Sequence, residues 1–459
     1  MTGRQLAVYD FAVQPALGDF YLFLQASLSL SSELGIEDVD LCVVADPSRT
    51  RNSVFLPLLE EGALRAKLFE LLPMTQLHPK IRNVFVVERM DLAIELARRT
   101  DSPYQSCWPP CEMLLSDSLA GGQYIYYANF AQLDRLHRGR EVMPRLRARP
   151  MVAEWARDFL AAHGRGGVPV TVNLRSNPTH GTHRNMVANA WRTFFDRAAS
   201  AHKATFFLLG AVAEDFSMFR SCANVVITKD WFTTAEQDLA LIEHAEAHMG
   251  CSSGPSTFPV FVGDKPASIV NCDAIGDLHT YRGSFFLEGA YLRFSFGSPN
   301  YRVTTTPETE ASLLCEFEVI MGVLAERTAR RQSDAMKLDA ACARGMDLHR
   351  EGHLDLAGQL YRAVLTAAPL HPGANYGLGM LKVQMQQPHD GLPHLKAALL
   401  AQLDVPDYWL GYLEVLMQVG QDDVARNILA LGLRQGISGA AIDELAARLR
   451  NPSPRPAVA

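Results

Sequence analysis

The sequence has little that would place this chain in a membrane or on nucleic acid. No run of about 18 or more uncharged apolar residues occurs, so no membrane span is predicted. Asp10 interrupts the first apolar stretch, and a secretory signal peptide is therefore not expected. The net charge of −7 argues against a nucleic-acid binder, because such proteins carry a basic face.

The motifs of several enzyme classes are also missing. Neither Gly-x-x-x-x-Gly-Lys-Ser/Thr nor Gly-x-Gly-x-x-Gly occurs, so P-loop chemistry and a dinucleotide cofactor are not expected. Cys107 and Cys111 have no second Cys or His pair with which to bind zinc. The eight cysteines are scattered, several in apolar runs, which is typical of reduced thiols in the cytoplasm. We predict a cytoplasmic protein that holds no cofactor and no metal.

Strand-like and helix-like segments alternate over the first 330 residues, which predicts a layered α/β architecture. Expected strands lie at 6–13, 39–45, 83–87 and 123–127, then at 170–174, 205–209 and 225–228. The basic segment 138–149 ends in Pro150 and is interpreted as a linker. These features predict two Rossmann-like domains, residues 1–150 and 151–330, with a cleft between them.

Beyond residue 330 the strand signals stop, and a 34-residue period appears. Small side chains recur at Ala357, Gly391 and Ala425, and larger ones recur four positions later, at Tyr361, Leu395 and Leu429. This spacing predicts tetratricopeptide-like helix pairs over residues 331–450, although two prolines, Pro388 and Pro393, fall in the second repeat. An unrelated helical bundle is the alternative. The Pro-rich segment 451–459 is expected to be disordered.

One segment, from Gly250 to Ser256, combines a strand end with a run of small residues. A helix is predicted over 235–248, a short strand over 249–251, and an apolar helix after the loop. Small residues at a helix start let backbone N–H groups approach an anion, and the helix dipole favours negative charge there. We predict a site for a phosphate-bearing donor, made of Ser252, Ser253, Gly254, Ser256 and Thr257. An ordinary strand-to-helix turn is the alternative.

Two charged residues occupy comparable places in the two halves. Asp19 follows Gly18 after the first strand, where its carboxylate could accept a proton from an acceptor hydroxyl. Helix capping is the alternative role of this aspartate. Arg175 follows the first strand of the second half, and its guanidinium suits a diphosphate. A structural ion pair is the alternative role of this arginine.

Taken together, these motifs resemble the GT-B glycosyltransferases over roughly residues 5–275. Gly18-Asp19 and the serine loop are similar to motifs of bacterial heptosyltransferases, and Arg175 is similar to the donor-binding arginine of GT-B fucosyltransferases. Ser252 stands where heptosyltransferases have Asp, and the histidine of their loop is replaced by Ser256-Thr257. The resemblance therefore implies a nucleotide-activated sugar as donor, without implying that the sugar is heptose.

The motifs and the resemblance together predict a bacterial-type glycosyltransferase that moves a sugar from a nucleotide-sugar donor to an acceptor hydroxyl. Asp19 is the expected base, while Gly18, Arg175 and the serine loop are the expected donor-binding residues. We find no Asp-x-Asp motif of the metal-dependent glycosyltransferase type, which favours a metal-independent mechanism. The helical repeats are expected to recruit a protein acceptor or partner. The alternative is a non-catalytic scaffold with a degenerate α/β part.

Overall fold

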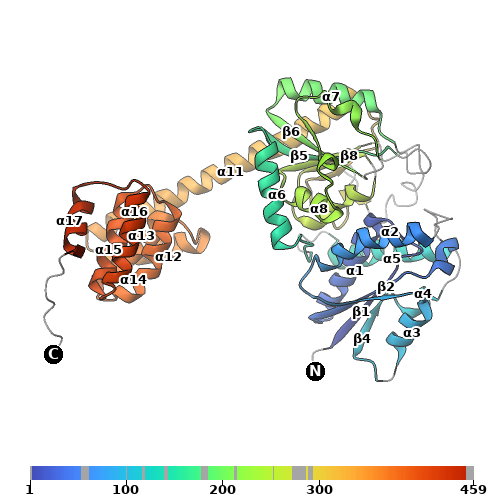
Figure 1. The fold of residues 1–459 in the computed structure, drawn as a ribbon, viewed down its shortest axis with the longest axis horizontal. Helices are drawn as coiled ribbons and strands as arrows, with labels where there is room; N and C mark the ends of the chain where they lie inside the picture. The colour runs from blue at the N-terminus through green and yellow to red at the C-terminus, as the bar shows by residue number, and fades with distance from the viewer. Residues whose placement is uncertain are drawn as a thin grey trace. The chain divides into compact units, whose positions relative to one another are not determined.

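The computed structural model describes residues 3–52, 61–99, 101–115, 119–138, 143–176, 185–210, 214–251, 253–270, 286–287 and 293–450 (Figure 1). The chain divides into two compact units, Met1–Ala325 and Glu326–Ala459.

The first unit begins with a four-stranded parallel sheet in the order β3-β2-β1-β4. Its strands are β1 (Arg4–Asp10), β2 (Asp38–Val44), β3 (Ile81–Val87) and β4 (Tyr104–Trp108). The main helices of this half are α1 (Leu17–Glu33), α2 (Glu61–Leu71), α3 (Met90–Arg98) and α5 (Leu119–His137). Alternate residues of β1 enter different cores, since Tyr9 packs on Phe20 and Phe23 of α1, whereas Val8 joins Ala93 of α3. The strand is therefore buried on both faces, as in other parallel sheets.

The strand predicted at 123–127 is wrong, because these residues lie inside α5. Tyrosine and isoleucine favour strands, but this preference is weak and depends on packing. Farther along the same helix, Phe130 and Leu133 are three residues apart and both buried in the core that α1 also enters. Burial of this helical stripe overrides the local preference. The fourth strand is instead β4, which the sequence analysis missed.

The second half of this unit holds a six-stranded parallel sheet in the order β12-β9-β8-β5-β6-β7. Its strands are β5 (Val168–Asn173), β6 (Ala204–Leu209), β7 (Val225–Ile227), β8 (Ala247–Cys251), β9 (Ala267–Val270) and β12 (Tyr301–Val303). Its helices include α6 (Pro150–His163), α7 (Ala188–Ala201), α8 (Ala235–His244) and α9 (Phe258–Val262). Two short strands, β10 (Phe286–Leu287) and β11 (Arg293–Phe294), form a separate antiparallel pair. The predicted fold class, two Rossmann-like sheets followed by a helical-repeat region, is confirmed.

The helix predicted over 235–248 ends earlier, at His244, and His248 lies in β8. A capping box at Thr234 and Gln237 starts this helix. At its other end the chain becomes extended at Ala245, and Ala247 then pairs with β5. His244 and His248, four residues apart in sequence, therefore do not share a helical face.

The two α/β halves share one apolar cluster. The ring centroids of Tyr21 on α1 and Phe258 on α9 are 3.9 Å apart. Near the predicted linker, Arg149 donates to Glu236 at the start of α8, with an Nη2 to Oε2 distance of 2.6 Å. Glu236 is 2% exposed, so this carboxylate depends on the arginine for compensation of its buried charge.

A continuous helix, α11 (Glu310–Arg350), crosses the boundary between the two units. Leu313, Phe317 and Ile320 near its start are buried against the second sheet. Cys342 and Leu348 near its end are buried in the first core of the helical region. The domain boundary expected at residue 330 thus falls within a helix.

The helical unit continues as antiparallel neighbours joined by short turns. They are α12 (Leu354–Ala367), α13 (Pro372–Gln384), α14 (Pro388–Ala401), α15 (Pro406–Gln418), α16 (Asp422–Arg434) and α17 (Ala440–Arg450). The periodic residues occupy equivalent buried places on α12, α14 and α16. Helix α13 meets α14 so closely that a Cβ on Gly391 would lie 2.7 Å from the carbonyl oxygen of Gly379.

Three turns of these repeats share a left-handed backbone at positions 34 residues apart. The φ angles are 88° at Gly352, 63° at Gln386 and 82° at Gly420. Glycine adopts this conformation without steric cost, whereas Gln386 does not. Pro388 begins α14, where its missing N–H is tolerated, but Pro393 lies inside that helix. The second repeat therefore keeps the fold despite two residues that suit it poorly, Gln386 and Pro393.

Candidate functional site

The two motifs predicted in separate halves touch each other at two glycines. Gly18 lies in the first turn of α1, and Gly254 begins the short 3-10 helix η6 (Gly254–Thr257). A Cβ on Gly18 would lie 2.7 Å from the Cα of Gly254 and 3.0 Å from its carbonyl oxygen. No side chain fits at this distance, so the backbones themselves are in contact. The structure therefore brings the start of α1 against the serine loop.

The serine loop is held by its own hydroxyl groups. Ser256 Oγ donates to the carbonyl of Ser253 at 2.5 Å, and Thr257 Oγ1 donates to the carbonyl of Gly254 at 3.0 Å. From outside the loop, Tyr301 OH of β12 donates to the carbonyl of Ser256 at 2.9 Å. Ser252, the remaining predicted donor-binding residue of the loop, lies outside the described residues.

The apolar helix predicted after this loop is present but short. It consists of the four residues of η6 followed by the five residues of α9, which ends at Val262. The next residue, Gly263, has a φ of 141°. The helix dipole grows with aligned peptide units, so its attraction for an anion is weaker here than the sequence suggested. Any anion binding at this loop therefore depends mainly on individual amide and hydroxyl groups.

Asp19 is the third residue of α1 and is 7% exposed. It is not the N-cap, because that position belongs to Ala16, whose side chain makes no capping bond. A carboxylate in the first turn still interacts favourably with the helix dipole. Burial raises the pKa of Tyr9, and the negative charge of Asp19 raises it further. The catalytic role of Asp19 stays a prediction.

Two residues at the end of β1 hold the loop that leads to Gly18 and Asp19. Tyr9 OH donates to the carbonyl of Gln14. Asp10 accepts from Arg49 Nε at 2.7 Å, and both side chains are nearly buried. Burial raises the pKa of Asp10 to about 6, although the Arg49 charge opposes this shift. This buried ion pair therefore fixes the end of β1, and sequence analysis missed it.

A buried amide joins β5 to the serine loop. Asn173 Nδ2 donates to the carbonyl of Cys251 at 3.1 Å and to Ser253 Oγ at 2.6 Å. Its Oδ1 lies 2.7 Å from His248 Nε2. Because the amide nitrogen donates to the loop, the amide oxygen must accept, which assigns a proton to His248 Nε2. This contact fixes the position of Ser253 relative to the second sheet.

The histidine in this network is completely buried. His248 Nδ1 lies 3.0 Å from Thr171 Oγ1, so both ring nitrogens have partners. Burial and, to a smaller extent, the charge of Lys265 lower the pKa of His248 to about 3. The ring is therefore neutral at physiological pH, and it acts here as a positioning group.

Arg175 lies two residues beyond the end of β5 and is partly buried. Its carbonyl accepts from the N–H of Met186 at 2.9 Å. Since Asn173 pairs with Gly250 of β8 in a parallel register, the chain leaves both strands at the same edge of the sheet. The structure thus brings Arg175 and the serine loop to one edge. The polar loop at 177–184 lies outside the described residues.

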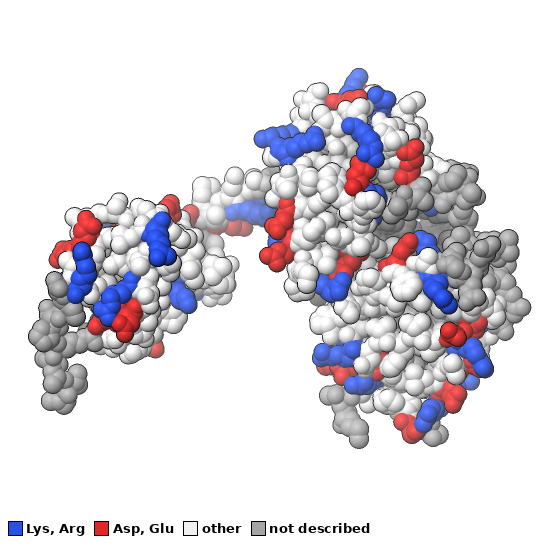
Figure 2. Space-filling view, in the orientation of Figure 1, with Lys and Arg blue, Asp and Glu red and all other residues white. Residues whose placement is uncertain are grey.

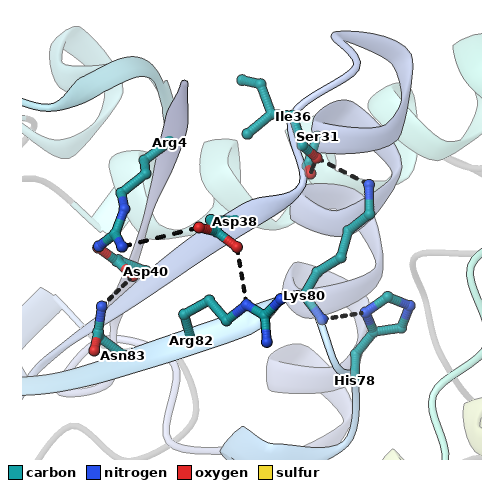
Figure 3. Close-up of polar contacts among 9 residues, drawn as sticks. All are labelled: Arg4, Ser31, Ile36, Asp38, Asp40, His78, Lys80, Arg82 and Asn83. Carbon is teal, nitrogen blue, oxygen red and sulfur yellow. Dashed lines mark hydrogen bonds and ion pairs between the residues drawn. The ribbon is translucent and has the colours of Figure 1, made fainter. Parts of the chain in front are cut away.

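An Asp-x-Asp triplet does occur, contrary to the expectation from the sequence, at Asp38-Val39-Asp40 of β2. Figure 3 shows both carboxylates with partners on neighbouring strands. Asp38 accepts from Arg82 at 2.8 Å, and Asp40 accepts from Arg4 at 3.0 Å. These contacts lie at the amino ends of the strands, whereas Gly18 and Asp19 follow the carboxyl end of β1. The triplet is therefore structural in this chain.

Other features of the described residues bear on ligands. No group of three or more His, Cys, Asp or Glu side chains is placed to hold a metal within the described part of the chain. A cavity of about 270 Å³ is lined by residues that include Arg157, Pro169 and His244. It lies at the amino end of β5, away from the serine loop.

On the face shown in Figure 2, acidic and basic side chains are interspersed. No helix in the described ranges is long and apolar enough to span a bilayer.

Comparisons with known proteins find likenesses in structure only. No protein-family model matches the chain, and no curated protein matches it. A crystal structure of the glycosyl transferase family 9 from Veillonella parvula DSM 2008 aligns with 69% of this chain and 97% of its own, at 11% identity and a TM-score of 0.42.

The tetratricopeptide (TPR) domain of Sgt2 from Aspergillus fumigatus aligns with 27% of this chain and 88% of its own, at 13% identity and a TM-score of 0.23. The Yersinia enterocolitica chaperone SycD, in complex with a peptide of the translocator YopD, aligns with 25% and 87%, at 18% identity and a TM-score of 0.22. The likenesses are to the glycosyltransferase and tetratricopeptide folds that the sequence resembles.

Sequence analysis named Asp19, Arg175 and the serine loop but missed Asn173 and His248, which hold the loop in place. Asn173 and Gly250 face each other so closely that a Cβ on the glycine would lie 2.4 Å from the amide oxygen. A buried asparagine at a strand end and a glycine before a serine loop were both visible in the sequence. Their pairing was not, because it depends on the order of the strands in the sheet.

Proposed function

We propose that this chain is a glycosyltransferase that transfers a sugar from a nucleotide-activated donor to an acceptor hydroxyl. Residues 151–330 would bind the nucleotide sugar, and residues 1–150 would present the acceptor. The observation that carries the proposal is the contact between Gly18 and Gly254. It joins the segment that carries Asp19 to the loop that carries Ser253, so the proposed base and the proposed anion-binding loop lie on adjoining segments.

The chemistry follows from what these groups can accept and donate. The acceptor oxygen attacks the anomeric carbon, the bond from that carbon to the diphosphate breaks, and the acceptor proton passes to the Asp19 carboxylate. Arg175 would offset the negative charge that develops on the departing diphosphate. The amide and hydroxyl groups of Ser253, Ser256 and Thr257 would complete the donor site. The reaction balances without a metal or a bound cofactor.

Support for a preorganised site comes from the buried network beneath the loop. Asn173 holds Ser253 Oγ at 2.6 Å, and its amide oxygen is held in turn by His248. Donors that are fixed before the ligand arrives lose less conformational entropy when it binds. This arrangement supports a binding function for the loop better than an ordinary turn would.

The helical repeats at 331–450 would recruit a protein that carries the acceptor hydroxyl. Stacked helix pairs form extended surfaces, because each repeat contacts mainly its neighbours. Deleting the helical repeats is therefore expected to lower the rate of transfer to a protein acceptor more than the rate of transfer to a small acceptor.

Calorimetric titration of the full chain with UDP, GDP, ADP and CMP tests the proposal. Binding of one nucleotide in preference to the others is the expected result, and it would also identify the donor class. Turnover should persist in excess EDTA if the mechanism needs no metal. If none of the nucleotides binds, the alternative of a non-catalytic scaffold is favoured instead.

A further inference from the structure

The outer strand of the first sheet is apolar and exposed. β3 is the edge strand, since the order of the sheet is β3-β2-β1-β4. Its central residues Val84, Phe85 and Val86 are 37%, 38% and 45% exposed. Proteins usually protect such edges with proline, lysine or a covering segment, because an open edge pairs with other strands. The run Val84–Val87 contains no proline and no charged residue.

The direction of the backbone groups along β3 follows from one bond. The carbonyl of Val87 accepts from the N–H of Ala45, which continues β2, so the polar groups of Val87 face β2. Because the N–H and C=O groups of a strand alternate in direction, those of Phe85 also face β2. The groups of Val84 and Val86 therefore point away from the sheet, where a further strand would lie.

We infer that this edge pairs with β3 of a second copy of the chain, to give one continuous eight-stranded sheet across a two-fold axis. The two strands run antiparallel with the two copies of Phe85 opposite each other. In this register Val84 of one copy exchanges both backbone bonds with Val86 of the other, and the exchange occurs twice by symmetry. A two-fold axis needs only one self-complementary surface, and this edge supplies it.

Charge complementarity selects this register. With Phe85 at the axis, Arg82 lies opposite Glu88 of the other copy, since the two residues are each three positions from the centre. The side chain of Arg82 is 58% exposed to solvent, and Glu88 is exposed as well. A register shifted by two residues would keep the backbone bonds but would separate these charges. Opposite charges across an antiparallel pair stabilise it, and like charges oppose it.

The partner is thus a second copy because the edge is complementary to itself in three respects. The outward N–H and C=O groups match, the apolar side chains face each other, and the two charges are exchanged. An unrelated extended peptide would use the backbone groups but would not require both Arg82 and Glu88. An experiment on these two charges therefore distinguishes a second copy of the chain from an unrelated peptide.

Charge reversal in the full chain tests the inference by sedimentation velocity. Wild type is expected to be a dimer at concentrations of about 10 μM, whereas Arg82→Glu and Glu88→Arg should each weaken dimerisation roughly tenfold. An equimolar mixture of the two variants should recover dimers. In the mixed dimer the introduced glutamate of one variant lies opposite the introduced arginine of the other, and the unchanged Arg82 lies opposite the unchanged Glu88. Recovery on mixing cannot come from a folding defect.

A backbone variant gives an independent readout. Val86→Pro removes an outward N–H, which an edge strand tolerates, so the monomer should fold while dimerisation is lost. Circular dichroism of this variant checks that the fold is kept. A monomeric wild type, or a dimer that Val86→Pro and both charge reversals leave unchanged, would overturn the inference. Failure of the mixed variants to pair would overturn the register centred on Phe85.

Discussion

Gly18 and Gly254 lie in direct backbone contact, although they are far apart along the chain. Each belongs to a different α/β half, and each opens a helical turn. The contact leaves no room for a side chain on Gly18. A side chain on Gly18 would therefore push the two halves apart at the proposed site.

Gly18→Ala is expected to destabilise the protein by about 1–3 kcal/mol, because the new Cβ would overlap the backbone of residue 254. Alanine normally stabilises a helix relative to glycine by about 1 kcal/mol, so the steric effect must reverse the usual sign. Gly322→Ala is the matched control, since nothing lies within 4 Å of a Cβ there. Urea unfolding of both variants measures the effect. Equal behaviour of the two would contradict the close contact.

Arg175→Ala should weaken binding of the preferred nucleotide by about 1.5–3 kcal/mol, the usual contribution of a hydrogen bond to a charged group. Titration calorimetry gives this value directly. Arg192→Ala is a suitable control, because Arg192 is an exposed residue of α7. A folded Arg175→Ala protein with wild-type affinity would remove this residue from the donor site.

Asp19→Asn keeps the shape of the side chain but removes its basicity. Turnover is expected to fall by about 10²–10⁴-fold while donor affinity is kept. The comparison is Asp355→Asn, which neutralises an exposed acidic residue in the first turn of α12. Both are assayed with a small artificial acceptor, so that recruitment by the repeats does not matter. Near-normal turnover in Asp19→Asn would leave this residue with a structural role only.

His248 should make the first unit sensitive to acid. Its pKa is about 3 in the folded protein against an ordinary value of 6.5, so the unfolded chain binds the proton first. The resulting stability is present above pH 6.5 and is lost as the pH falls. Between pH 6.5 and pH 5 wild type should lose about 2 kcal/mol more unfolding free energy than His248→Gln. His389→Gln, at an exposed position, should follow wild type. Parallel curves for all three proteins would contradict the burial of a neutral ring.

Gln386→Gly is expected to stabilise the helical unit by about 1 kcal/mol. The φ angle of 63° at this position is strained for any residue with a Cβ, and glycine occupies the two equivalent turns. Glu414→Gly, at an exposed position in the interior of α15, should have the opposite sign. Thermal unfolding of the two variants distinguishes them. A lower melting temperature for Gln386→Gly would mean that the glutamine side chain makes a compensating contact.

Much of the architecture could be predicted because its signals are local. The strand at 205–209 is a run of apolar residues, and it forms β6 (Ala204–Leu209). The period through Ala357, Gly391 and Ala425 reflects a packing need that recurs in each helix pair. The segment 123–127 was assigned wrongly because local strand preference opposes the burial of α5, and only the tertiary structure decides between them.

The candidate site could be predicted only in part, for a different reason. Gly18, Asp19 and Arg175 stand at element ends, where sequence patterns are informative. Asn173 and His248 are 75 residues apart, and their contact exists only because β5 and β8 are neighbours in the sheet. The triplet Asp38-Val39-Asp40 is visible in the sequence, but its partners Arg4 and Arg82 come from neighbouring strands. Strand order is a global property, so no short window of sequence contains it.

Asp40 also has a consequence for how the first sheet assembles. Its carboxylate is nearly buried and accepts from Arg4 on β1, Asn83 on β3 and Tyr104 on β4, partners 36, 43 and 64 residues away in sequence. None of these bonds can form until the strands lie in the right order, and a shifted strand would leave a buried charge without its donors, at a cost of about 1–3 kcal/mol for each missing bond. One side chain thus stabilises the native order of the four strands relative to compact arrangements in which a strand is misplaced.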